Sequence, residues 1–142
     1  MTKFRFLNHT ADVYIEAYGK DLKEAFENAA LGMFEVIVNT GNVTASEELD
    51  ISVEGSDLQS LLYNWLEELL YLFDAKGLVF SEFKVLRITI GEAVYRLEAK
   101  VRGEKFNPEK HEGRTAIKAV TYSLMEVQVK PEGVTLRFVL DI

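Results

Sequence analysis

Two aspartates stand where the ends of two strands could bring them together. Asp12 opens a segment in which polar and apolar residues alternate, and Asp141 is the penultimate residue of a similar segment at the end of the chain. If the two segments pair antiparallel, the start of one lies beside the end of the other, and the two carboxylates meet. The free carboxylate of Ile142 would lie one residue away.

Carboxylates crowded in this way repel one another unless protons or a cation compensate. Ligation by oxygen alone suits Ca²⁺, Mg²⁺ or Mn²⁺ rather than zinc or copper. The sequence therefore allows a divalent-metal site formed by Asp12, Asp141 and the terminal carboxylate of Ile142. Two simpler interpretations stay open: Asp12, which follows Thr10, is also typical of a turn, and Asp141 of a solubilising residue at a chain end.

The other chemistry-bearing residues form no recognisable catalytic motif. His9 and His111 are the two histidines of the chain, which excludes a multi-histidine metal centre, and His111-Glu112 lacks the second histidine of an HExxH motif. The chain has no cysteine, which excludes disulfides, thiolate metal ligands and a cysteine nucleophile. It also has no glycine-rich phosphate loop and no GxSxG elbow.

The polar segment 103–114 is predicted to be a loop, because it contains Pro108 and Gly113 between well-patterned segments. A charged loop that holds one aromatic residue, Phe106, and one histidine, His111, is a common place for a binding site. A histidine on such a loop is also commonly an exposed surface residue.

The overall charge bears on possible partners. The 142 residues include 16 Lys and Arg against 23 Asp and Glu, which gives a net charge of −7. Such a field repels a phosphate backbone, although a few cations fall close together in the sequence (Lys105, Lys110, Arg114 and Lys118). We therefore expect any link to RNA to be indirect, through a protein partner.

Length and composition indicate a single globular domain, 1–142, with 48% hydrophobic residues. No stretch approaches the roughly 18 apolar residues of a membrane span, and the N-terminus has no apolar run typical of a signal peptide. These features favour a cytoplasmic protein.

The hydrophobic patterns predict an α+β fold on a mostly antiparallel sheet. Asp21 and Glu24 form a capping box for one amphipathic helix, and Ser56 or Asp57 can cap a second that ends at Gly77. A third helix is expected to follow Thr115. The predicted strands lie around residues 4–6, 13–18, 49–53 and 134–142, with a hairpin formed by 85–90 and 95–101.

Several blocks of the sequence, in order, resemble the archease family: FLNHTADV, EAYGKDLKEAFENAALGMF, DLQSLLYNWLEELLYLFD, KHEGRTAIKAVTYSLMEV and the final VLDI. The resemblance covers essentially the whole chain. It implies a protein cofactor, itself no enzyme, that activates an RtcB-type RNA ligase in tRNA splicing and RNA repair. The activator promotes GTP-dependent guanylylation of the ligase and its multiple turnover.

The resemblance also implies residue roles. The metal site of the family would fall on Asp12, Asp141 and Ile142, with calcium among the candidate ions. Further signature positions are candidates for binding the partner or supporting the site: His9, Lys110, His111, Lys118 and Thr121. Many members have Asp where this chain has Asn8, and His where it has Ser123.

Two alternative functions stay open. A small metal-dependent hydrolase would use Asp12, Asp141 and His111, although nothing in the sequence supplies a convincing nucleophile. A general chaperone or adaptor would act on unrelated clients and show no preference for the ligase.

Overall fold

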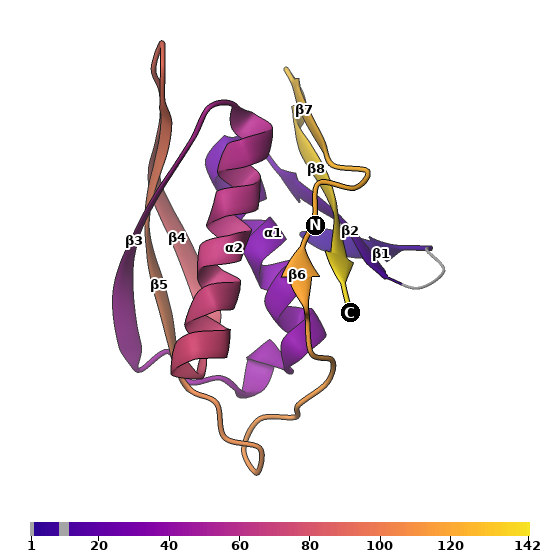
Figure 1. Cartoon of the computed structure of the whole chain (residues 1–142), viewed down its shortest axis with the longest axis vertical. Helices are drawn as coiled ribbons and strands as arrows, with labels where there is room; N and C mark the ends of the chain where they lie inside the picture. Colours follow the sequence, from indigo (N-terminus) through magenta and orange to yellow (C-terminus); the bar gives the residue numbers. More distant parts are fainter. Residues whose placement is uncertain (1, 9–11) are drawn as a thin grey trace.

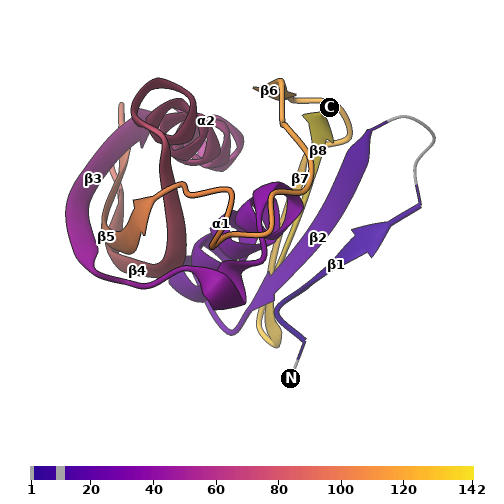
Figure 2. The ribbon, with the colours of Figure 1, turned by 90° about the horizontal axis from the view of Figure 1, so that it is seen from below.

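The computed structural model describes residues 2–8 and 12–142 and contains two antiparallel sheets with two long helices between them (Figure 1, Figure 2). One sheet has the order β1-β2-β8-β6, with β7 also paired to β8, and the other has the order β3-β5-β4. This arrangement confirms the predicted α+β class. The elements are β1 (Phe4–Leu7), β2 (Val13–Gly19), α1 (Leu22–Ile37), η1 (Thr40–Asn42), β3 (Glu47–Gly55), α2 (Leu58–Lys76), β4 (Leu78–Ile90), β5 (Tyr95–Lys105), β6 (Ala119–Val120), β7 (Glu126–Lys130) and β8 (Gly133–Asp141).

Helix α1 begins after the predicted N-cap, Asp21, but the capping box is incomplete, because Glu24 bonds the N–H of Lys20 and not that of Asp21. The Asp21 side chain accepts the Glu24 N–H at 2.9 Å, and the Glu24 carboxylate accepts the Lys20 N–H at 2.7 Å. The turn before the helix is so tight that a Cβ on Gly19 would lie 2.2 Å from the backbone nitrogen of Ala25. Glycine is therefore required at this turn, which reverses the chain so that α1 packs against β2.

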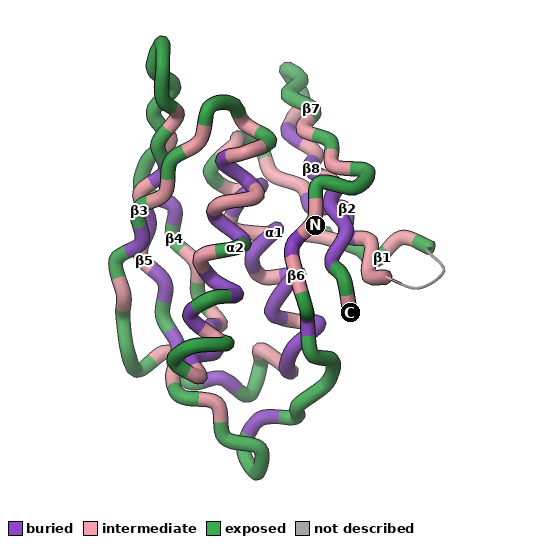
Figure 3. The backbone as a smooth tube through the Cα atoms, in the orientation of Figure 1, coloured by how far each residue is buried: buried purple, intermediate pink, exposed green. Residues whose placement is uncertain are grey.

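Helix α2 is capped at both ends. Asp57 accepts the Ser60 N–H at 2.7 Å, and Gly77 ends the helix in the left-handed conformation with φ of 66°. The fully buried Trp65 donates its indole N–H to the Phe26 carbonyl at 3.0 Å, which joins α2 to α1. The buried faces of both helices form the core between the sheets (Figure 3).

The predicted hairpin is confirmed, and its strands are longer than the alternating pattern indicated. Strands β4 and β5 pair from Ile90–Tyr95 to Leu78–Lys105, with irregularities at Phe80/Glu82 and Val85/Arg87. The first residues of the expected loop, 103–105, therefore belong to β5. A Cβ on Gly103 would lie 1.9 Å from the Val79 carbonyl oxygen, so this glycine permits the close approach of the two strands.

The predicted third helix is wrong. Residues 115–130 contain the short strands β6 and β7 and no helix, and Leu124 has a φ of 55° in the turn between the two strands. The helical spacing of Ile117, Val120, Leu124 and Val127 was misleading: Leu124 is 53% exposed, while Val120 and Val127 pair with β8. Pairing with β8 satisfies the backbone and buries β-branched residues, which outweighs the local periodicity.

A row of alternating charges crosses the outer face of the first sheet. Arg5, Glu16, Arg137 and Glu126 face one another in succession on β1, β2, β8 and β7. Arg5 Nε lies 2.8 Å and Arg137 Nε 2.5 Å from the Glu16 carboxylate, which also accepts the Tyr18 hydroxyl. Burial raises the pKa of Glu16, but the hydrogen bonds from Tyr18, Arg137 and Arg5 outweigh it and leave this pKa below its ordinary value.

Within the described residues, the structure has no helix long and apolar enough to cross a membrane.

Candidate functional site

The pairing of β2 with β8 brings the predicted aspartates to one end of the first sheet. The last paired residues are Val13 and Leu140, and one further step in the same register places Asp12 opposite Asp141. Facing residues of antiparallel strands lie about 5 Å apart between Cα atoms. The side chain of Ile142 packs against the core, which holds the chain end beside Asp141.

Two of the predicted supporting residues, Lys118 and Thr121, lie directly before and after β6, which pairs with the end of β8. The Lys118 N–H donates to the Asp141 carbonyl at 2.7 Å, and Ala119 pairs with Asp141. The Thr121 hydroxyl donates to the Val139 carbonyl at 2.8 Å. Lys118 and Thr121 therefore position the last residues of β8 through its backbone.

A hollow of about 320 Å³ adjoins Asp12, between the end of β1 and the C-terminal end of α1. One wall is held by Arg114, which donates to the Glu35 carbonyl at 2.9 Å and lies 3.1 Å from the Glu35 carboxylate. The sequence carries no periodic signal for this pairing across 79 residues. The lining residues are Phe6, Leu7, Asp12, Val13, Tyr14, Glu35, Val36, Arg114 and Thr115.

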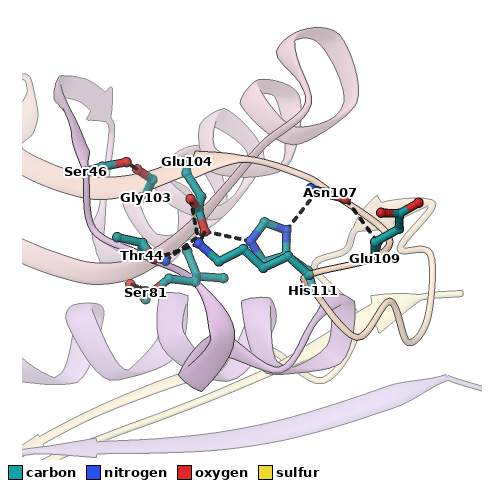
Figure 4. A network of polar contacts seen from close by, with 10 residues as sticks. Thr44, Ser46, Ser81, Gly103, Glu104, Asn107, Glu109 and His111 are labelled. Carbon is teal, nitrogen blue, oxygen red and sulfur yellow. Dashed lines mark hydrogen bonds and ion pairs between the residues drawn. The ribbon is translucent and has the colours of Figure 1, made fainter.

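His111 and Lys110 belong to a different network, which closes the loop after β5 (Figure 4). His111 is 1% exposed, so the expectation of an exposed surface histidine is wrong. Its Nδ1 accepts the Asn107 N–H at 2.8 Å, and its Nε2 lies 2.7 Å from Glu104. The ring also stacks on Phe106. Because Nδ1 is an acceptor here, the proton lies on Nε2 and is donated to Glu104.

Glu104 is the centre of this network, and sequence reasoning missed it because an acidic residue in a polar, charged segment has no distinguishing signal. Its carboxylate lies 2.8 Å from Lys110 Nζ and accepts the Thr44 N–H at 2.8 Å. The Lys110 ammonium, the Thr44 N–H and His111 together lower the pKa of Glu104 to about 2. Lys110 and His111 of the loop and Thr44 of a distant segment meet at this carboxylate, so the network holds the loop to the rest of the fold.

The remaining predicted residues contribute less to the described site. His9 lies outside the described residues. Asn8 and Ser123 are exposed. Within residues 2–8 and 12–142, no group of three or more His, Cys, Asp or Glu side chains is placed to hold a metal ion. The predicted metal site has two of these side chains, Asp12 and Asp141, and the terminal carboxylate of Ile142 as its third ligand. This site stays a prediction.

The geometry gives little support to the hydrolase alternative. That alternative needs His111 as a base, but both ring nitrogens of His111 are engaged inside the loop. Its side chain is fully buried and has no contact with solvent. A base must reach the proton that it removes, which this imidazole does not do.

Comparison with known proteins agrees with these features. The model of the Archease protein family (MTH1598/TM1083) matches residues 4–142. The chain belongs to the archease family. It is 47% identical to protein archease of Sulfurisphaera tokodaii over the full length of both chains. It is 50% identical to protein archease of Pyrococcus furiosus, over 94% of this chain and 93% of that protein.

Solved structures show the same fold. The solution structure of Methanobacterium thermoautotrophicum protein 1598 superposes with a TM-score of 0.87, at 42% identity and over all of both chains. The crystal structure of an archease from Thermotoga maritima, described as a possible chaperone, has a TM-score of 0.60 at 20% identity. The match covers 96% of this chain and 94% of the Thermotoga maritima chain, and at this identity it supports only the fold.

Proposed function

We propose that this archease-family chain activates an RtcB-type RNA ligase in the cytoplasm, as an accessory protein of tRNA splicing and RNA repair. It promotes GTP-dependent guanylylation of the ligase and repeated turnover, and it contacts RNA only indirectly. The observation that carries the proposal is the register of β2 and β8, which directs Asp12 and Asp141 to one end of a sheet in a chain of this family.

The donor set fits a hard divalent cation. Asp12, Asp141 and the carboxylate of Ile142 offer oxygen atoms, which suit Ca²⁺, Mg²⁺ or Mn²⁺. A bound cation would supply positive charge that compensates the repulsion between these carboxylates. The chain itself contributes the positioning: β8 is held between β2 and β6, and the Ile142 side chain is anchored in the core.

The carboxylate end would dock at the ligase active site and favour the state that is competent for guanylylation. A partner shifts such an equilibrium only by binding one state better than the other. The hollow beside Asp12, lined by Phe6 and Arg114, offers an apolar and a cationic contact for this docking.

The test measures the rate and turnover number of a purified RtcB-type ligase with GTP and a divalent ion, with this protein at substoichiometric dose. Asp12→Ala and Asp141→Ala should each reduce the stimulation by at least about tenfold while the fold persists. Asp50→Ala is the matched control, because Asp50 is an exposed aspartate on β3 of the other sheet. Full stimulation by folded Asp12→Ala protein would contradict the proposal.

Metal binding is tested separately by the thermal unfolding midpoint. Ca²⁺ or Mn²⁺ should raise the midpoint of the wild-type protein and of Asp50→Ala, because a ligand that binds only the folded state stabilises it. The midpoints of Asp12→Ala and Asp141→Ala should not respond. Appending one glycine after Ile142, which moves the carboxylate, should weaken the response.

A general chaperone is the second candidate, favoured by the description of the Thermotoga maritima archease as a possible chaperone. It predicts suppression of aggregation for unrelated client proteins. It also predicts that Asp12→Ala and Asp141→Ala keep that activity.

A further inference from the structure

Strand β7 lies at an open edge of the first sheet (Figure 1). In the part of the chain that the structure describes, β7 pairs with β8 alone. Val129 is 58% exposed, and four of the five residues of the strand are exposed (Figure 3). An open strand edge presents unpaired N–H and C=O groups and is a template for another strand.

The sequence of β7, EVQVK, is complementary to itself in the antiparallel direction. When a second copy runs antiparallel about an axis at Gln128, Glu126 faces Lys130 of that copy, and Val127 faces its Val129. Gln128 faces its own counterpart. Each opposite-charge and β-branched pair occurs twice, and such cross-strand pairs stabilise a sheet.

The charged row of the sheet continues across this edge. Arg5, Glu16, Arg137 and Glu126 alternate in sign, with Arg137 Nη1 3.5 Å from the Glu126 carboxylate. Lys130 of the second copy would be the next positive charge in the row. Among the described residues, Lys130 of the same chain has no carboxylate within ion-pair distance, so it is available for this contact.

The apolar residues of the strand agree with the same pairing. Val127 packs against the core on the inner face, and Val129 lies on the same face but is mostly exposed. Pairing places Val129 beside Val127 of the second copy and removes apolar surface from water on both chains.

The β4 edge of the other sheet and the β1 edge are less suitable. At the β4 edge, the Val85 N–H is taken by the Glu27 carboxylate of α1 at 2.8 Å, and two irregularities interrupt the strand. Strand β1 has only four residues.

We propose that β7 is a dimerisation edge, at which two copies of this chain pair antiparallel about Gln128 into one continuous sheet. Asp141 lies six positions along β8 from Thr135, the partner of Gln128, which is about 20 Å of strand. Since the two β8 strands run in opposite directions, the two carboxylate ends point away from each other. The carboxylate end of each copy therefore stays accessible in the dimer.

Sedimentation equilibrium of the full chain over a wide range of concentration tests the proposal. Wild-type protein should show a concentration-dependent monomer–dimer equilibrium. Lys130→Glu should raise the dimer dissociation constant at least about tenfold, because it places a carboxylate opposite Glu126 of the other copy at both contacts. Ile90→Asp is the control, because Ile90 is 55% exposed at the tip of the other long hairpin, and it should leave the constant unchanged.

A mixing experiment makes the pairing specific. Glu126→Lys alone should also weaken the homodimer, because it sets the new base against Lys130. Mixed with Lys130→Glu it should form a heterodimer, in which both contacts again join opposite charges. Far-UV circular dichroism checks the fold of each variant, and if Glu126→Lys misfolds, the comparison of Lys130→Glu with wild type still decides.

Three results would overturn the proposal. They are a wild-type chain that stays monomeric at every concentration, a Lys130→Glu variant that associates as tightly as wild type, and an association that Ile90→Asp abolishes.

Discussion

Removing the imidazole of His111 would leave a cavity where a fully buried side chain lies and would take one hydrogen-bond partner from each of two groups. The Asn107 N–H loses its acceptor, and Glu104 loses one of its donors. We expect His111→Ala to lower the free energy of unfolding by about 2–4 kcal/mol, because it combines the cavity with the loss of two hydrogen bonds that hold the loop. Urea unfolding followed by circular dichroism measures this.

Glu109→Ala, on the same loop but exposed, should change the unfolding free energy by less than about 0.5 kcal/mol. If His111 is structural, His111→Ala protein that is still folded should stimulate the ligase as wild type does. Loss of stimulation without loss of stability would assign His111 a direct role in the partner contact.

The carboxylate of Glu104 links stability to pH. Its pKa is lowered to about 2 in the folded protein by Lys110, the Thr44 N–H and His111, below the ordinary value near 4.5. A lowered carboxyl pKa stabilises the folded state fully above the unfolded pKa, and the contribution is lost as the pH falls toward 2. The unfolding free energy of Glu104→Gln should therefore lie below that of wild type at neutral pH and approach it near pH 2. A constant difference across this range would contradict the role given to the charge.

At the scale of the elements, the turn between β6 and β7 gives a prediction that also separates strand from helix. Leu124 has a φ of 55°, a conformation that costs a leucine roughly 1 kcal/mol and that asparagine adopts more easily. Since Leu124 is 53% exposed, Leu124→Asn loses little burial and should raise the thermal midpoint slightly. In a helix the same change would lower it, because asparagine has the weaker helix propensity.

The two long helices and the main hairpin could be predicted from sequence because their signals are local. Asp21 with Glu24, Asp57 and Gly77 mark helix ends through backbone chemistry within a few residues. The β6–β7 segment could not, because its conformation depends on pairing with β8, which follows it in the chain.

The same distinction holds for the site. The placement of Asp12 and Asp141 at the same end of β2 and β8 follows from strand direction and alternation, which the sequence carries. The hydrogen bond between His111 and Glu104 depends on how the loop after β5 folds back on that strand, and no periodic pattern in the sequence predicts it.

At the scale of the whole molecule, the helices lie between the sheets and should make unfolding a single transition. Leu97 of β5 is fully buried in the common core, and Leu97→Ala should cost about 2–5 kcal/mol. Trp65 fluorescence and far-UV circular dichroism should report coincident transitions in wild type and variant. Separate transitions, with one sheet outlasting the other, would show that the two sheets are independent.

The charged row on the outer face of the first sheet also limits how this sequence can change over evolutionary time. Replacing Glu16 alone would leave Arg5 and Arg137 beside each other without the carboxylate between them. Replacing one arginine alone would leave a nearly buried carboxylate undercompensated. Positions 5, 16 and 137 should therefore covary among relatives, with substitutions at one accompanied by compensating substitutions at the others.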